Sequence, residues 1–297
     1  MTNLNKDTNL NSVFSASVSL LNSDLSLDIG ATIAHAEKIE KLGIAPAFNG
    51  STSQGQSLSI EDKKKLIKEI LKKKFKNLLI STASNSLHDT QNLIRYSLDQ
   101  GYKGAFLIMN PAYGSPTDLG VYNFFSNIQK SVPSQIVLYN FSKLASNYAF
   151  SEEICKKLTN EFGTEAFIGM KDSTGNCWEN LKIDNFSMLV GNEINLLKNL
   201  ELGGSRGVIS ATTQCCPSLA RKVFEKKDQR DNEKMSAIRN AFDATGNLIT
   251  AVHYFLSLSD SRYERMLPPL TPLSKEKQKK LLNDLKKIGF YPERKAA

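Results

Sequence analysis

The sequence predicts an α/β fold, a closed (β/α)8 barrel followed by a C-terminal helical extension. Short apolar segments alternate eight times with amphipathic helical segments between residues 13 and 210, and such alternation indicates a parallel sheet. Several of the apolar segments are nearly continuous, as expected for strands that are buried on both faces. The 297 residues contain no linker and no break in composition, and eight units of this size fit one closed barrel.

The apolar and amphipathic segments give the expected order of the elements. We expect strands at residues 13–19, 44–48, 77–81, 104–109, 135–139, 166–170, 186–190 and 207–210. The helices between them are expected at residues 29–43, 63–76, 87–101, 117–130, 151–162, 175–182 and 193–204. Ser59 and Ser151 precede two of these helices as N-caps, because a serine hydroxyl accepts a hydrogen bond from the first helical turn.

The same pattern divides the chain into three parts. Residues 1–12 form a polar N-terminal arm, residues 13–228 the barrel and residues 229–297 the C-terminal helical extension. An open, doubly wound sheet is the alternative architecture. No G-x-G-x-x-G motif follows the first strand, which weakens a dinucleotide-binding version of that alternative.

The net charge of +8 comes almost entirely from one segment. Residues 63–76 hold eight lysines and one acidic residue, so the rest of the chain is nearly neutral. Leu66, Ile67, Ile70 and Leu71 recur there at helical spacing, which places the lysines on the outer face of a helix. One basic helix without interleaved aromatic residues is a weak nucleic-acid signal, so we expect no nucleic-acid partner.

Composition also limits the location and the cofactors. With 40% hydrophobic and 23% charged residues, a polar N-terminus and no apolar run of membrane length, we expect a cytoplasmic protein without a membrane partner. The four cysteines form no C-x-x-C pair, and the three histidines are far apart. This pattern favours neither a metal site nor a disulfide framework.

In a (β/α)8 barrel the chemistry lies at the C-terminal ends of the strands. Lys171 directly follows the sixth expected strand. By strand alternation Phe167, Gly169 and Lys171 share a face, and Gly169 leaves room for the lysine stem. Burial favours the neutral amine, which can attack a ketone and form a Schiff base. A snorkelling or ion-paired lysine is the alternative interpretation of the same residue.

Three other strand ends carry candidate groups. Tyr139 ends the fifth strand, where it is either a core residue or a proton shuttle beside the lysine. Ser51 and Thr52 lie in a Gly-Ser-Thr turn after the second strand, whose N–H groups and hydroxyls suit a carboxylate. An ordinary polar turn is the alternative. Tyr113 lies on the loop after the fourth strand and suits packing or a subunit contact.

Taken together, IGMKDSTGN, VLYN, GST, NPAYGSP, VGNEI and LGGSRGVIS resemble the motifs of the dihydrodipicolinate synthase / N-acetylneuraminate lyase family, the pyruvate-dependent class I aldolases. The resemblance covers residues 13 to about 225. It implies that Lys171 forms the imine and that Tyr139 is the general acid/base. Ser51 and Thr52 would then bind the carboxylate of pyruvate. Tyr113 would reach the site of a neighbouring subunit and relay protons with Ser51 and Tyr139.

The resemblance also implies the remaining contacts and partners. Ser173 would contact the substrate, as in the lyase branch. The residues that would face the second substrate are Gly191, Asn192, Glu193 and Ser210. The partners are pyruvate or another 2-keto acid and an aldehyde, and the chain would form a homotetramer or homodimer. No metal or other cofactor is expected, because the iminium itself accepts the electron pair.

Departures from the family pattern bear on the substrate. Ser53 and Gln54 replace the usual Gly-Glu after the turn, and Ala112 replaces the first of two tyrosines. The synthases carry an arginine where this chain has Leu144, and the neighbouring Lys143 lacks the fork geometry of arginine. The sequence therefore favours an aldolase that acts on a 2-keto-3-deoxy sugar acid or N-acetylneuraminate. The alternatives are the synthase of lysine biosynthesis and a non-catalytic relative that binds a keto acid.

Overall fold

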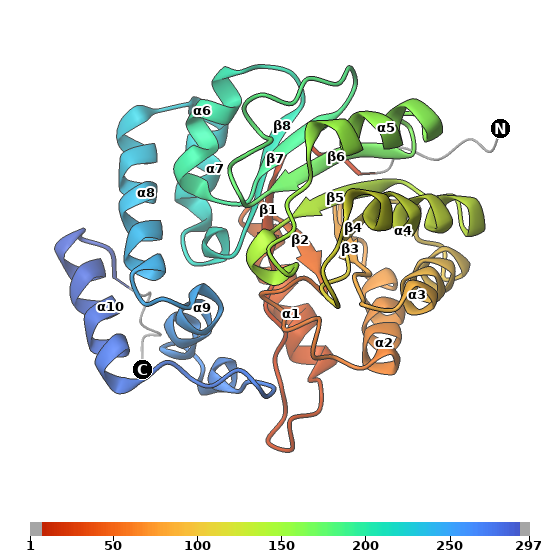
Figure 1. The fold of residues 1–297 in the computed structure, drawn as a ribbon. Coiled ribbons are helices and arrows are strands. Elements are labelled where there is room, and N and C mark those ends of the chain that lie inside the picture. The colour runs from red at the N-terminus through yellow and green to blue at the C-terminus, as the bar shows by residue number, and fades with distance from the viewer. Residues whose placement is uncertain (1–7, 292–297) are drawn as a thin grey trace.

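The computed structural model describes residues 8–291, and eight parallel strands form a closed barrel in the order β1 to β8 (Figure 1). The strands are β1 (Val13–Ala16), β2 (Ala45–Phe48), β3 (Leu79–Ser81), β4 (Phe106–Met109), β5 (Ile136–Asn140), β6 (Phe167–Asp172), β7 (Ser187–Val190) and β8 (Arg206–Ser210). The predicted closed (β/α)8 barrel is confirmed, and each strand lies within or close to its expected segment.

Helices surround the barrel and continue beyond it. They are α1 (Ile29–Lys41), α2 (Ile60–Leu71), α3 (Leu87–Asp99), α4 (Asp118–Ser131), α5 (Glu152–Phe162), α6 (Leu196–Glu201), α7 (Pro217–Lys226), α8 (Gln229–Asp243), α9 (Leu248–Ser257) and α10 (Lys275–Lys287). Short 3-10 helices are η1 (Ser142–Leu144), η2 (Glu193–Asn195), η3 (Thr212–Gln214) and η4 (Ser261–Glu264). Ser59 and Ser151 cap α2 and α5, as expected from the sequence. No helix within residues 8–291 is both long and apolar enough to cross a membrane.

Two apolar layers hold the barrel together. Inside the barrel, small and medium side chains such as Ala16, Ala47 and Leu107 pack against Phe14. Outside it, branched and aromatic side chains fill the space between strands and helices. Leu10 is buried against the interior layer, so residues 8–12 of the expected arm contribute to the barrel, and residues 1–7 of that arm lie outside the described residues.

The alternation of side chains along β6 is interrupted. The register between β5 and β6 shifts at Ile136 and Val137. As a result Phe167 packs on the helix side, against Phe125 and Phe162, while Lys171 lies on the interior side. The expectation that Phe167 and Lys171 share a face is therefore wrong, because a bulge inserts one residue between them.

Two further expectations are wrong. Residues 175–182 form turns and no helix, because the Asp172 carboxylate accepts the N–H groups that a helix would use internally. Lys63 is not on an outer face. It is 3% exposed, and its ammonium donates to the Ala83 carbonyl at 3.4 Å.

The C-terminal helices α8, α9 and α10 (blue) lie together beside α7, on one side of the barrel (Figure 1). Helices α8 and α9 pack together through a buried aromatic pair. The ring centres of Phe242 and Phe255 lie 5.5 Å apart. Helix α8 also contacts η2, which follows β7. The extension therefore touches the end of the barrel at which the strands terminate.

Candidate active site

The side chains of Lys171 and Tyr139 meet at the carboxyl end of the barrel. The two residues pair across β5 and β6, and both point into the interior. The Lys171 nitrogen lies 4.0 Å from the centre of the Tyr139 ring, and the two side chains are 4% exposed. Within residues 8–291 the ammonium of Lys171 has no ion-pair partner, and it faces the Tyr139 ring. This arrangement excludes the alternative of an ion-paired lysine within the described chain.

The Tyr139 hydroxyl connects the lysine to the Gly-Ser-Thr turn. It lies 3.1 Å from the hydroxyl of Ser51, and either oxygen can donate the hydrogen. A small cavity opens at this contact. Its lining residues are Asn49, Gly50, Ser51, Gln56, Ser81, Ala83, Met109 and Tyr139. The Tyr139 side chain and Ser51 therefore border a small cavity.

The turn that carries Ser51 and Thr52 is closed by its own hydrogen bonds. The amide of Gln54 donates to the Ser51 carbonyl at 3.0 Å, and the Ser53 hydroxyl donates to the Gly50 carbonyl at 2.7 Å. Gly55 is required here, because a Cβ atom at that position would collide with the backbone of Asn49. Thr52 is buried in this turn, next to the partly exposed Ser51.

The residue after the lysine anchors the following loop. Asp172 is 2% exposed, and its carboxylate accepts backbone N–H groups of Thr174, Cys177 and Trp178 at 2.8–3.0 Å. It also accepts from the side chain of Asn140, the residue after Tyr139. Both catalytic candidates are thus followed by residues of one hydrogen-bonded network, which restrains the ends of β5 and β6.

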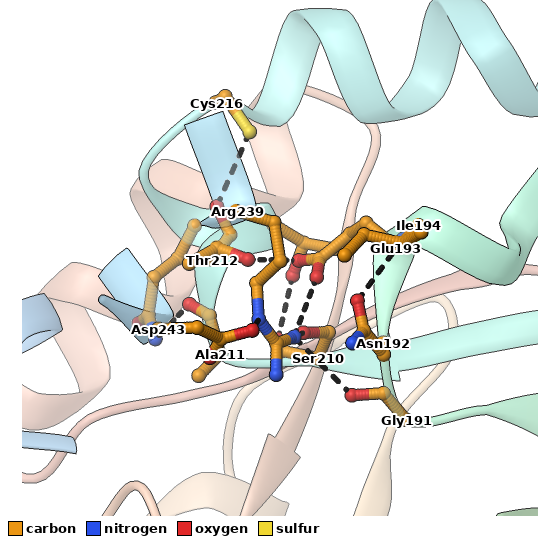
Figure 2. A network of polar contacts seen from close by, with 12 residues as sticks. Gly191, Asn192, Glu193, Ile194, Ser210, Ala211, Thr212, Cys216, Arg239 and Asp243 are labelled. Carbon is orange, nitrogen blue, oxygen red and sulfur yellow. Dashed lines mark hydrogen bonds and ion pairs between the residues drawn. The ribbon is translucent and has the colours of Figure 1, made fainter. Parts of the chain in front are cut away.

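The ends of β7 and β8 form a second polar network (Figure 2). The Glu193 carboxylate is fully buried and pairs with Arg239 of α8 at 2.8 Å. It also accepts a hydrogen bond from Thr212. The same Arg239 nitrogen donates to the Ser210 hydroxyl at 3.0 Å, and the second guanidinium edge pairs with Asp243 at 2.9 Å. The structure thus gives Glu193 and Ser210 partners within the protein, and their expected contact with a substrate stays a prediction.

The other residues expected to face the second substrate are more exposed to solvent than Glu193 and Ser210. Gly191 and Ser173 are in close contact, and a Cβ atom at position 191 would collide with the serine side chain. Asn192 is half-buried and accepts the Ile194 amide through its side chain at 3.0 Å. Gly191 also joins the two networks, because its amide donates to the Asp172 carbonyl at 2.7 Å.

Two loop residues define the periphery of the site. Tyr113 is 88% exposed and does not line the cavity at Tyr139, so within one chain it does not join Ser51 and Tyr139. Leu144, in η1, is half-buried against the interior layer that includes Tyr139. The neighbouring Lys143 is exposed.

Three residues of the site region have no role in the sequence-based prediction. Asn49 is 4% exposed and lines the cavity, and neither polar atom of its amide has a hydrogen-bond partner among residues 8–291. Its position at the end of the second apolar run was the available signal. Arg239 and His253 come from α8 and α9, far from any strand end, so no local pattern identifies them.

Known proteins resemble this chain in sequence and in fold. The profile of the dihydrodipicolinate synthetase family matches residues 13–288. The 4-hydroxy-tetrahydrodipicolinate synthase of Coxiella burnetii (strain Dugway 5J108-111) is 24% identical over 81% of this chain and 85% of its own. A 2-dehydro-3-deoxy-D-gluconate/2-dehydro-3-deoxy-phosphogluconate aldolase of Picrophilus torridus is 26% identical over 69% of this chain and 77% of its own.

A solved structure shares the fold. A prophage protein of the dihydrodipicolinic acid synthase family from E. coli K12, determined in complex with pyruvate, superimposes with a TM-score of 0.82. It is 21% identical, and the match covers 94% of this chain and 99% of the other. The fold and the site define a carbon–carbon lyase of the aldolase type. The chain belongs to the dihydrodipicolinate synthetase family.

Proposed function

We propose that this protein is a class I, Schiff-base aldolase that cleaves or forms a 2-keto-3-deoxy sugar acid or N-acetylneuraminate, with pyruvate as the keto-acid product or substrate. One observation carries the proposal. Lys171 is buried without a counter-ion against the face of Tyr139, whose hydroxyl is 3.1 Å from Ser51. A lysine in this setting is suited to nucleophilic attack on a ketone. We also propose that the protein is cytoplasmic.

The reaction follows from these three side chains. The Lys171 amine attacks the ketone carbon of the 2-keto acid, and loss of water gives an iminium ion. In the cleavage direction Tyr139, as phenolate, removes the proton of the C4 hydroxyl. The C3–C4 bond then breaks and the aldehyde leaves. The electron pair of the broken bond forms the C2–C3 double bond of an enamine, and the iminium nitrogen becomes neutral. Protonation at C3 and hydrolysis release pyruvate and restore the free amine.

The turn at residues 50–54 orients the substrate. Ser51 and Thr52 would hold the carboxylate of the keto acid through hydroxyl and N–H groups, which fixes the ketone relative to the lysine. Because the turn is closed by internal hydrogen bonds, these donors require little reorganisation when the carboxylate binds. Ser51 has a second role, since its contact with Tyr139 provides a path for the proton.

Tyr113 suggests that the complete site needs a second subunit. Its side chain is 88% exposed on the loop after β4 and is therefore accessible to a neighbouring copy. We propose that it inserts into the site of a neighbouring copy in a homodimer or homotetramer, where it extends the proton path through Ser51 and Tyr139.

The environment of Leu144 supports the choice of a sugar acid. A synthase must hold the carboxylate of aspartate semialdehyde, and a leucine packed on the interior layer offers that carboxylate no donor. Leaving the carboxylate unpaired in a closed site costs about 1–3 kcal/mol or more. Lys143 is exposed and lacks arginine's planar fork, so it is a poor substitute.

Substrate panels separate the candidate functions. We expect pyruvate release from at least one 2-keto-3-deoxy acid or from N-acetylneuraminate, and weak or no condensation of pyruvate with aspartate semialdehyde. An efficient condensation, with kcat/KM of about 10⁴ M⁻¹s⁻¹ or more, would instead establish the synthase that the Coxiella relative is named for. Binding of keto acids without turnover of any substrate would indicate a non-catalytic relative.

A further inference from the structure

The C-terminal extension contacts the turn at residues 50–54 at two points. His253 of α9 is fully buried, and its Nε2 atom lies 3.1 Å from the carbonyl oxygen of Thr52. Gln54 is 3% exposed, and its side-chain oxygen accepts the amide of Leu267 at 2.6 Å. The Gln54 side-chain nitrogen also lies 3.5 Å from the Arg265 carbonyl, to which it can donate. The turn is therefore held from outside as well as by its own hydrogen bonds.

The side-chain amide of Gln54 suits this position. An amide can accept from Leu267 and donate to Arg265 at the same time, whereas a carboxylate can only accept. The backbone of Gln54 has a φ of 57°, in the left-handed region, so the contact holds a conformation that a non-glycine residue seldom adopts. The Gln54 side chain thus matches both the carbonyl oxygen of Arg265 and the amide of Leu267.

His253 belongs to a longer chain of contacts. Its Nδ1 atom lies 2.8 Å from the Tyr263 carbonyl, and the Tyr263 hydroxyl lies 2.8 Å from Nδ1 of His35 on α1. The other His35 nitrogen lies 2.8 Å from the side-chain oxygen of Gln214, and the side-chain nitrogen of Gln214 donates to the Ala16 carbonyl at the end of β1. A continuous polar path therefore joins β1 to the turn after β2 through the extension.

We propose that His253 and Gln54 are positioning residues through which the C-terminal extension sets the affinity of the turn for the carboxylate of the keto acid. This inference rests on the proposed function of that turn. With its ring proton on Nε2, His253 donates to the Thr52 carbonyl and fixes it, and the side chain of Gln54 fixes the backbone directly after Ser53. Between these two points lie the hydroxyl and N–H groups that would bind the carboxylate.

The size of the effect follows from the contacts. When one of these hydrogen bonds is lost, the turn can adopt geometries in which its donors no longer converge on the carboxylate. The net free energy of one hydrogen bond corresponds to about a tenfold change in an equilibrium constant. Within residues 8–291 no hydrogen bond or ion pair joins the reacting side chains Lys171 and Tyr139 to His253 or Gln54. The effect therefore falls on the pyruvate concentration needed for half-saturation and not on the reaction of bound pyruvate.

The test uses the full-length chain and two leucine variants, H253L and Q54L. Borohydride trapping is measured over a range of pyruvate concentrations. We expect the half-saturating concentration to rise about tenfold in each variant, while the trapping rate at saturation stays within about threefold of wild type. H253Q and Q54E, which each keep one of the two polar contacts, should show smaller shifts.

The matched control is L281A in α10. Leu281 is fully buried in the extension, so this variant lowers the melting temperature without touching the turn. Equal shifts in half-saturation for L281A and the leucine variants would overturn the proposal, as would unchanged half-saturation in both leucine variants.

A second measurement does not depend on pyruvate. Amide hydrogen exchange of a peptide that covers residues 50–57 should be about tenfold faster in H253L and Q54L than in L281A. Unchanged exchange would refute the positioning role even if wild-type protein formed no adduct. Failure of wild-type protein to form an adduct with pyruvate would refute the proposed function alone.

Discussion

Removal of the Arg239 guanidinium is expected to destabilise the protein more than any change at a surface ion pair. Arg239 is 8% exposed and Glu193 is fully buried, so in R239M the carboxylate would lose its charge partner in a site without solvent. Breaking a buried pair by removing one partner costs about 3–5 kcal/mol. The hydrogen bond from Thr212 remains and reduces the loss toward the lower figure. For a chain of this size we expect the melting temperature to fall by roughly 5–10 °C.

The assay is thermal and urea unfolding at neutral pH, with K222M as the control. Lys222 of α7 pairs with Asp231 of α8 at 2.7 Å, but its side chain is 51% exposed. An exposed pair of this kind contributes little to stability, because water screens the two charges. The double variant E193L/R239M removes both charges and should recover part of the loss. An R239M variant that loses no more unfolding free energy than K222M would refute the reasoning. A double variant that is less stable than R239M would refute it as well.

Two further predictions concern proton transfer and pH. Y139F should keep imine formation and lose about 10²–10⁴-fold in turnover, because its hydroxyl moves protons and does not hold pyruvate; turnover within about threefold of wild type would remove Tyr139 from the mechanism. Burial lowers the pKa of His35 from 6.5 to about 4, so the unfolded chain binds a proton that the folded chain does not between these values. His35 therefore contributes stability that is fully present above pH 6.5 and is lost as the pH falls toward 4. At pH 5 the loss amounts to about 2 kcal/mol. H35Q should have a flatter dependence of unfolding free energy on pH than H88Q, and equal slopes would contradict the assignment.

Local patterns in the sequence predict the barrel and the centre of the site. Strand ends follow from apolar runs: Tyr139 is the last residue of one such run, and Lys171 directly follows another. The fold then brings them together because neighbouring parallel strands end at the same edge. The same reasoning fails where a bulge changes the alternation, as at Phe167.

Contacts over long sequence separations were beyond local patterns. Arg239 and Glu193 are 46 residues apart, and His253 and Thr52 are 201 residues apart. Nothing in the sequence near Glu193 indicates that its carboxylate is neutralised by a helix of the extension. The helix expected at residues 175–182 is absent for a related reason. The Asp172 carboxylate accepts backbone N–H groups of this segment, and the local sequence does not reveal that contact. Side-chain competition of this kind is a tertiary effect.

Covalent trapping of pyruvate at Lys171 tests the central claim most directly. The full-length protein is incubated with pyruvate and borohydride, digested, and analysed by mass spectrometry. The proposed mechanism predicts one reduced pyruvate adduct per chain, located on Lys171 and absent from K171A. A wild-type protein that forms no adduct, or an adduct that persists in K171A, would contradict it.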